Sequence, residues 1–176
     1  MKAHATALVD PAATIADDVE IGPFCVVGPG ATIGPRCRLG PRVSLRGPAT
    51  LGRDNILHAN VTLDGPVAIG DGNVLRESTH VGPNATIGSR CSFGAWVNIG
   101  DRATIGDDAL LGAFAVVAEG CSLGSKVRVE GQTVLEPGMK IGTGARIRSQ
   151  VPVTGDVDAA VLLDGNPAEA QAGGAP

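Results

Sequence analysis

The chain has 176 residues, with 26 glycines, 12 prolines, only 2% aromatic residues and a net charge of -4. This composition indicates a globular protein built from turns rather than from packed helices. The acidic balance and the scarcity of aromatic rings argue against nucleic-acid binding, which needs a basic face and stacking side chains. No stretch reaches the length of a membrane span, and the first residues lack the apolar core of a signal peptide. We therefore expect a cytoplasmic protein without a membrane span.

A large apolar residue stands at every sixth position from Val9 to Val153. The twenty-five positions are Val9, Ile15, Ile21, Val27, Ile33, Leu39, Leu45, Leu51, Leu57, Leu63, Ile69, Leu75, Val81, Ile87, Phe93, Ile99, Ile105, Leu111, Val117, Leu123, Val129, Leu135, Ile141, Ile147 and Val153. A period of six matches neither the 3.6 residues of a helix nor the alternation of a strand, so each repeat is predicted to be a short strand and a turn. Hexapeptide repeats of this kind build a parallel β-helix.

Three hexads form one triangular coil, so the repeats predict an all-β protein of about eight stacked coils. The sixth-position residues, and the small residues two positions before them, are expected to fill its centre. Gly follows the apolar residue in fourteen hexads, and we expect these glycines to supply the backbone freedom that the corners need. One continuous core predicts a single β-helix domain over residues 1–168. The segment 169–176, rich in Ala and Gly, is predicted to be a disordered tail.

Outward residues that are 18 apart should stack on the same side of the triangle. The first side presents a hydroxyl ladder of Thr14, Thr32, Thr50, Ala68, Thr86, Thr104, Ser122 and Lys140. The second presents Ile56, Val74 and Leu110 among Glu20, Arg38, Ser92, Arg128 and Arg146. The third presents Leu8, Val26, Val116 and Val134 around Ser44, Thr62, His80 and Asn98. Apolar groups on two adjoining sides indicate an interface, and we expect a homotrimer with the corner between those sides at the symmetry axis.

All four cysteines occupy the small inward position of their hexads: Cys25, Cys37, Cys91 and Cys121. Cys37 and Cys91 share a column but lie three coils apart, roughly 14 Å at the spacing of a sheet, which is too far for a disulfide. The sequence contains no C-x-x-C motif. We expect four buried, reduced thiols.

Four segments resemble UDP-N-acetylglucosamine acyltransferase, the first enzyme of lipid A synthesis. They are IGPFCVVGP (Ile21–Pro29), LGRDN (Leu51–Asn55), LRES (Leu75–Ser78) and VLLDGNPA (Val161–Ala168). The likeness runs nearly collinear from about Ala5 to Ala168. The resemblance implies a left-handed β-helix, a homotrimer, and sites for acyl-carrier protein and a nucleotide sugar in clefts between subunits.

The chemistry of that family uses a histidine as general base on a sugar hydroxyl. At the matching positions this chain has Asn98 in place of a first histidine and Asp101 in place of the base. We consider Asp101 and His80 as replacement bases: Asp101 stands at the position of the base but the ordinary pKa of aspartate is only about 3.9, whereas that of histidine, about 6.5, suits base work. Asn98, Arg76 and Glu77 are the expected substrate-binding residues. Arg76 would contact a phosphate or, alternatively, form a salt bridge at its corner.

Two functions of different class remain open. The first is acyl transfer from an acyl thioester, carried by acyl-carrier protein or coenzyme A, to a nucleotide-linked amino sugar, with no further cofactor. The second is a non-catalytic trimeric binding or scaffold protein. A zinc enzyme like the gamma-type carbonic anhydrases is a third reading, but it needs three converging histidines. His4 and His58 lie roughly 14 Å apart on one corner, and His80 projects elsewhere, so we predict no metal site.

Overall fold

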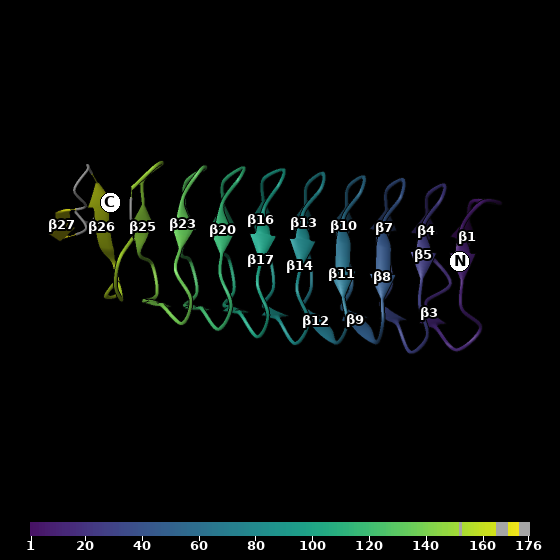
Figure 1. The fold of residues 1–176 in the computed structure, drawn as a ribbon. Helices are drawn as coiled ribbons and strands as arrows, with labels where there is room; N and C mark the ends of the chain where they lie inside the picture. The colour runs from purple at the N-terminus through teal and green to yellow at the C-terminus, as the bar shows by residue number, and fades with distance from the viewer. Residues whose placement is uncertain (152, 165–168, 173–176) are drawn as a thin grey trace.

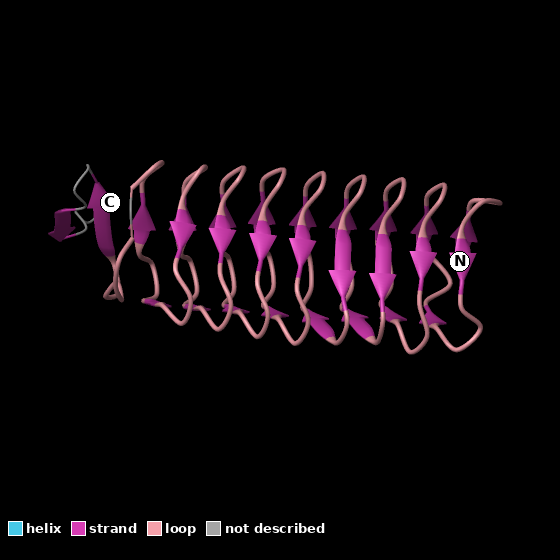
Figure 2. Ribbon diagram, in the orientation of Figure 1, coloured by secondary structure: helices cyan, strands magenta, loops and turns pink. Residues whose placement is uncertain are grey.

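The computed structural model describes residues 1–151, 153–164 and 169–172. The chain forms a parallel β-helix of about nine coils, with the N-terminus at one end and the C-terminus at the other (Figure 1). Every regular element in the described part is a strand, as Figure 2 shows. None of these residues therefore belongs to a helix with the length and apolarity needed to cross a membrane.

Three sheets form the three sides, and they correspond to the sides predicted from the sequence. Sheet A, the second predicted side, runs β1 (Lys2–Ala3), β4 (Glu20–Ile21), β7 (Arg38–Leu39), β10 (Ile56–Leu57), β13 (Val74–Leu75), β16 (Ser92–Phe93), β19 (Leu110–Leu111), β22 (Arg128–Val129), β25 (Arg146–Ile147), β26 (Val161–Asp164) and β27 (Glu169–Ala172). Sheet B, the third, runs β2 (Leu8–Val9), β5 (Val26–Val27), β8 (Ser44–Arg46), β11 (Thr62–Asp64), β14 (His80–Val81), β17 (Asn98–Ile99), β20 (Val116–Val117) and β23 (Val134–Leu135). Sheet C, the hydroxyl side, runs β3 (Thr14–Ile15), β6 (Thr32–Ile33), β9 (Ala49–Leu51), β12 (Val67–Ile69), β15 (Thr86–Ile87), β18 (Thr104–Ile105), β21 (Ser122–Leu123) and β24 (Lys140–Ile141).

Strands pair in parallel with the residue 18 positions further on, as in His80 with Asn98. We call the turns from sheet A to sheet B the AB corner, and name the BC and CA corners in the same way. The register changes only at the C-terminal end. There Leu163 pairs with Ile147, which is 16 residues earlier, and β26 pairs antiparallel with β27.

The coil count is about nine rather than the expected eight. One reason is that β1 lies before the first hexad, and the other is that the last coil, closed by β26, is off the six-residue grid. Strand β27 (Glu169–Ala172) lies within the segment that was expected to be a tail. Residues 165–168, which carry part of the VLLDGNPA segment, and residues 173–176 lie outside the described ranges.

The centre of the coils is filled as the period predicts. Every sixth-position residue from Ile21 to Val153 is buried, and Phe93 is 0% exposed. Burying one such side chain stabilises the fold by about 1.5–3 kcal/mol. All four cysteines are buried and free, as expected, and burial raises the pKa of each thiol. The prediction of four buried, reduced thiols is therefore confirmed.

The glycines do not have the role that we expected. None of the fourteen glycines that follow an apolar residue has a positive φ. They are required because the next coil approaches closely: a Cβ on Gly100 would lie 2.6 Å from the backbone nitrogen of Glu119. The left-handed residues stand elsewhere, and at the AB corner they are all other than glycine: Phe24, Arg42, Asn60, Ser78, Trp96, Phe114, Gln132 and Gln150.

Candidate functional site

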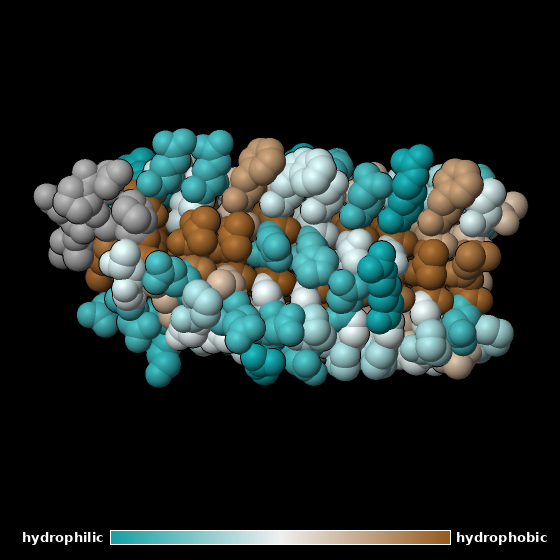
Figure 3. Space-filling view, in the orientation of Figure 1, coloured by the Kyte–Doolittle hydropathy of each residue, from teal (hydrophilic) through white to brown (hydrophobic). Residues whose placement is uncertain are grey.

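The outward column of sheet B changes character along the molecule. It is apolar in the first two and last two strands, and polar in the four strands between them, which carry Ser44, Thr62, His80 and Asn98. We call these four residues the polar window. Figure 3 shows this face, with brown surface at both ends and paler or teal surface between them. A polar patch framed by apolar groups is a candidate site.

His80 is the chemically versatile residue of the polar window. Its Nε2 lies 3.0 Å from Oδ2 of Asp64, and its Nδ1 lies 3.3 Å from Oδ1 of Asn98. Arg46 approaches the other oxygen of Asp64 at 3.7 Å. When Nε2 carries the proton and donates it to Asp64, Nδ1 has the free electron pair that a general base needs, and the Asn98 amide must turn so that its Nδ2 rather than its Oδ1 faces Nδ1.

Strand length explains how Asp64 reaches His80. Strands β8 and β11 have a third residue, so Arg46 and Asp64 continue the strands and are in register with each other. Asp64 therefore extends from the end of β11 toward the next coil, where His80 begins β14. The sequence contains a signal for this arrangement that we missed. Arg46 and Asp64 carry opposite charges 18 residues apart, at a position that holds glycine in several other coils.

Asn98 and Asp101 have different surroundings. Asn98 contacts His80, as their shared column predicts. Asp101 stands at the BC corner and packs over Gly82, where a Cβ would lie 2.8 Å from its Oδ1. Within the described ranges, the Asp101 carboxylate makes no hydrogen bond or ion pair with His80 or Asn98. The structure thus gathers His80 and Asn98, but not Asp101, into one group.

Glu77 and Arg76 lie at the AB corner rather than in the polar window. Oε1 of Glu77 is 3.2 Å from Nδ1 of His58. A hydrogen bond from its own backbone N–H, assisted by the charges of His58 and Arg76, lowers the pKa of Glu77. Arg76 is exposed and forms no ion pair with a described residue. The salt bridge considered for Arg76 is therefore not observed.

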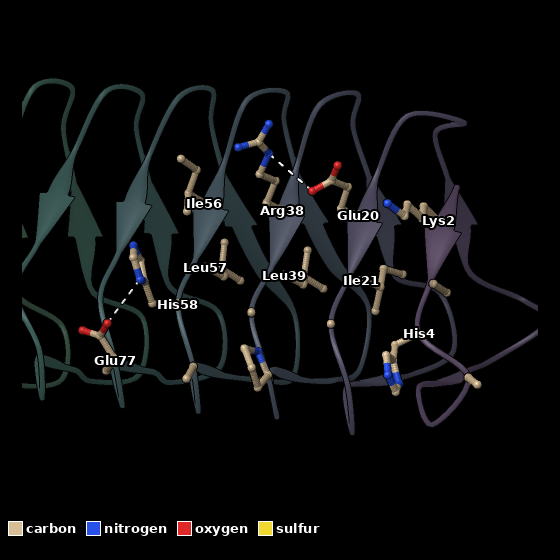
Figure 4. Close-up of a pocket in the computed structure, with 16 residues that line it drawn as sticks. Lys2, His4, Glu20, Ile21, Arg38, Leu39, Ile56, Leu57, His58 and Glu77 are labelled. Carbon is tan, nitrogen blue, oxygen red and sulfur yellow. Dashed lines mark ion pairs between the residues drawn. The ribbon is translucent and has the colours of Figure 1, made fainter.

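A groove of about 810 Å³ crosses the N-terminal coils over sheet A and the AB corner. Figure 4 shows its residues: His4 lies toward the N-terminal end, and the His58–Glu77 pair lies at the opposite end. Gly22 and Gly40 line the groove in the two coils between the histidines. At both positions a Cβ would meet the backbone of the next coil, at 2.9 Å from the carbonyl oxygen of Leu39 for Gly22 and 3.0 Å from the carbonyl carbon of His58 for Gly40. The groove was not predicted from the sequence, although the column of His4, Gly22, Gly40 and His58 marks its course.

The three histidines do not converge within one chain. Each of His58 and His80 faces one carboxylate, which supplies only two ligands. In the part of the chain that the structure describes, no group of three or more His, Cys, Asp or Glu residues converges on one point.

Two repeat families match parts of the chain. The pattern described as bacterial transferase hexapeptide (six repeats) matches residues 12–47 and 30–65. The pattern described as hexapeptide repeat of succinyl-transferase matches residues 102–137. A comparison with curated proteins gives no match.

Solved structures of UDP-N-acetylglucosamine acyltransferases share the fold. The enzyme (LpxA) from Moraxella catarrhalis is 27% identical, with a TM-score of 0.90 over 97% of this chain and 74% of its own. LpxA from Acinetobacter baumannii is 25% identical, with a TM-score of 0.64 over 96% and 73%. LpxA from Bacteroides fragilis, 15% identical with a TM-score of 0.89 over 96% and 73%, shows the fold alone. The chain is a hexapeptide-repeat protein with the acyltransferase fold that these LpxA structures share.

Proposed function

We propose that the protein is an acyltransferase that moves an acyl group from a thioester to a hydroxyl of a nucleotide-linked amino sugar. The observation that carries the proposal is the hydrogen bond between Asp64 and His80, the histidine of the polar window. The likeness to the Moraxella catarrhalis enzyme supports the reaction class. The resemblance also supports a place in lipid A synthesis, in the cytoplasm, with acyl-carrier protein or coenzyme A carrying the donor.

The proposed reaction starts from neutral His80. Its Nδ1 takes the proton of the acceptor hydroxyl while the oxygen attacks the carbonyl carbon of the thioester. The carbon–sulfur bond then breaks, and the leaving thiolate takes the proton back from the imidazolium. Asp64 orients the ring through Nε2 and stabilises its positive charge, as carboxylates do for other catalytic histidines. In this proposal His80 is the base and Asp101 is not.

The remaining predicted residues fit roles in substrate binding. Asn98 contacts the ring edge that would face the acceptor hydroxyl. Glu77 lines the groove and offers carboxylate oxygens to sugar hydroxyls. Arg76, exposed and without an ion pair in the described ranges, offers a guanidinium to a phosphate of the nucleotide sugar.

We also propose a homotrimer. Apart from Met1, the large exposed hydrophobic side chains lie on sheet A, sheet B or the AB corner: Leu8, Phe24, Val26, Trp96, Leu110, Phe114 and Val134. Placing the AB corner at a three-fold axis would bring sheet B of one chain against sheet A of the next and cover these groups. The polar window would then face a cleft between two chains.

One observation favours the second candidate, a non-catalytic binding protein. Both ring nitrogens of His80 already have partners within the chain, Asp64 and Asn98. If His80 acts as a base, its Nδ1 must leave Asn98 and contact the substrate hydroxyl instead. A protein that only binds a nucleotide sugar has no need for this exchange.

A turnover assay separates the two functions. The substrates are acyl-carrier thioesters and acyl-coenzyme A of several chain lengths, with UDP-N-acetylglucosamine as acceptor. We expect the wild type to turn over and His80→Ala to lose roughly 100-fold or more in kcat, the usual contribution of a general base. Asp64→Asn should lower kcat less and shift the pH profile of kcat/KM, whereas Thr104→Ala on sheet C serves as the control.

Two other outcomes of this assay would each contradict the role of His80 as the base. Wild-type protein that binds UDP-N-acetylglucosamine saturably but turns over no donor would establish the binding protein. Activity that survives in His80→Ala and disappears in Asp101→Asn would assign the base to Asp101.

A further inference from the structure

Most arginines of this chain are neutralised across one coil. Seven of them form ion pairs with a carboxylate of a neighbouring coil: Arg36, Arg38, Arg46, Arg53, Arg90, Arg102 and Arg148. The bond from Arg36 to Asp54, at 2.6 and 2.7 Å, is a bidentate example. A carboxylate beside the arginine is thus the commoner arrangement on the surface, and in the described ranges four arginines have no ion pair: Arg42, Arg76, Arg128 and Arg146.

Arg128 and Arg146 depart from this pattern. They occupy the same outward column in adjacent strands, β22 and β25, and are paired in register. Their Cα atoms are therefore about 4.8 Å apart. In the described ranges neither of them forms an ion pair. Like charges directly opposite each other destabilise a strand pair, so an anion bound between the two guanidinium groups would relieve this repulsion.

The two arginines line a hollow of about 280 Å³ on sheet A near the C-terminal end. Leu110 precedes them in the outward column and Leu162 follows them, and both line the hollow. Arg148 also lines it but lies 3.9 Å from Glu130 and 3.5 Å from Asp164, which offset its charge. The hollow therefore combines the Arg148–Glu130 pair, both of whose residues line it, with two guanidinium groups that have no ion pair in the described ranges and an apolar residue on either side.

We infer that this hollow binds the phosphate of a phosphate ester. Guanidinium groups match phosphate oxygens with paired hydrogen bonds, and two of them match the double charge of a phosphate monoester. In the proposed trimer this hollow would lie at the cleft between sheet A of one chain and sheet B of the next, and Leu110 and Leu162 would contact the apolar part of the ester there. The inference does not depend on the proposed acyl transfer, because it uses none of the residues of the polar window.

The test is a calorimetric titration of the protein with hexyl phosphate and, separately, with inorganic phosphate at constant ionic strength. We expect saturable binding of both probes, with hexyl phosphate bound more tightly because of its apolar chain. Arg128→Gln/Arg146→Gln should raise the Kd of both by tenfold or more. Arg42→Gln, which removes an exposed arginine at the AB corner, is the control and should leave the Kd unchanged.

A second measurement separates ligand binding from subunit contact. Sedimentation velocity of Arg128→Gln/Arg146→Gln should show the same assembly as the wild type. If the variant dissociates and the wild type binds neither probe, the arginines pair with a second copy and the inference is wrong. Equal weakening by Arg42→Gln, or tight binding of inorganic phosphate with no gain from the hexyl chain, would also contradict the site described here.

Discussion

Asn55 and Asn73 are fully buried in a column where other coils carry Cys37, Cys91, Ala109, Val127 or Ala145. Oδ1 of Asn55 accepts hydrogen bonds from the backbone N–H and the side-chain amide of Asn73, and its own amide donates to the carbonyl of Gly70. Cys37 donates in the same direction, from Sγ to the carbonyl of Gly52. The polar inward residues thus satisfy backbone groups that the narrow coils would otherwise leave without partners.

Asn55→Ala should lower the free energy of unfolding by about 1–3 kcal/mol, because it leaves buried donors and an acceptor unsatisfied. Cys37→Ala removes only a weak thiol donor from the same column and should cost less. Urea unfolding followed by circular dichroism measures both. Equal losses of unfolding free energy in the two variants would show that the hydrogen bonds of Asn55 do not account for the destabilisation.

The sequence predicted His80 and Asn98 as neighbours because both lie on the 18-residue column. It did not predict Asp64, which is 16 residues before His80 and reaches it from the end of a lengthened strand. The 18-residue spacing predicts which Cα atoms lie next to each other on adjacent coils. The direction of a side chain at a corner also depends on where its strand ends. For the same reason the sequence could not decide between His80 and Asp101.

At the scale of the strand and its turn, the close approach of successive coils dominates. A Cβ on Gly106 would lie 2.6 Å from the backbone nitrogen of Ser125, whereas a Cβ on Gly155 would meet nothing within 4 Å. The six-residue period predicted the strands and their three sides, but the reason for the glycines depends on spacing between coils, which the period does not contain. The shortened last coil was also unpredictable, since it leaves the hexad grid after Val153.

Gly106→Ala should therefore lower the free energy of unfolding by about 1–3 kcal/mol, the usual cost of overpacking. Gly155→Ala carries the same chemical change without the clash and should be close to neutral. Thermal or urea unfolding of the two variants compares them directly. A neutral Gly106→Ala would mean that the coils can move apart at little cost.

The CA corner adds a pH-dependent contribution. Hydrogen bonds and charge from Arg36 and Arg90 lower the pKa values of Asp54 and Asp108, respectively. A carboxylate with a lowered pKa in the folded state stabilises the fold above its unfolded pKa of about 3.9, and this contribution disappears as the pH falls through the folded pKa.

Asp54→Asn/Asp108→Asn should thus be less stable than the wild type at pH 7, and the difference should shrink as the pH falls below about 4. Melting temperatures across that range measure it. Asp158→Asn, at an exposed position, is the control for loss of a carboxylate. A gap between wild type and double variant that is constant with pH would contradict the role of the two ion pairs.

At the scale of the whole molecule, the AB corner carries exposed aromatic rings. Trp96 and Phe114 stand on adjacent coils with ring centroids 6.5 Å apart and planes 2° from parallel. They are 59% and 54% exposed, and both adopt a positive φ that bulky residues rarely take. Such rings are unfavourable in a free monomer, which supports the proposed three-fold axis along this corner.

Trp96→Asn/Phe114→Asn tests the assembly without harming the turns, because Asn tolerates a positive φ better than aromatic residues do. We expect the wild type to sediment as a trimer and the variant as a folded monomer. Lys126→Asn, at an exposed left-handed position of the CA corner, is the matched control and should remain trimeric. A wild type that is monomeric at every concentration would contradict the proposal.

Because each strand pairs only with the coil on either side of it, the molecule behaves as a linear stack whose cooperativity runs along one dimension. Local opening then begins as fraying at the two ends, where Val9 and Ile15 are only partly buried, and moves inward coil by coil. His80 lies near the middle of that stack. The contact between Asp64 and His80 would thus persist through partial melting, and amide hydrogen exchange would be slowest around it.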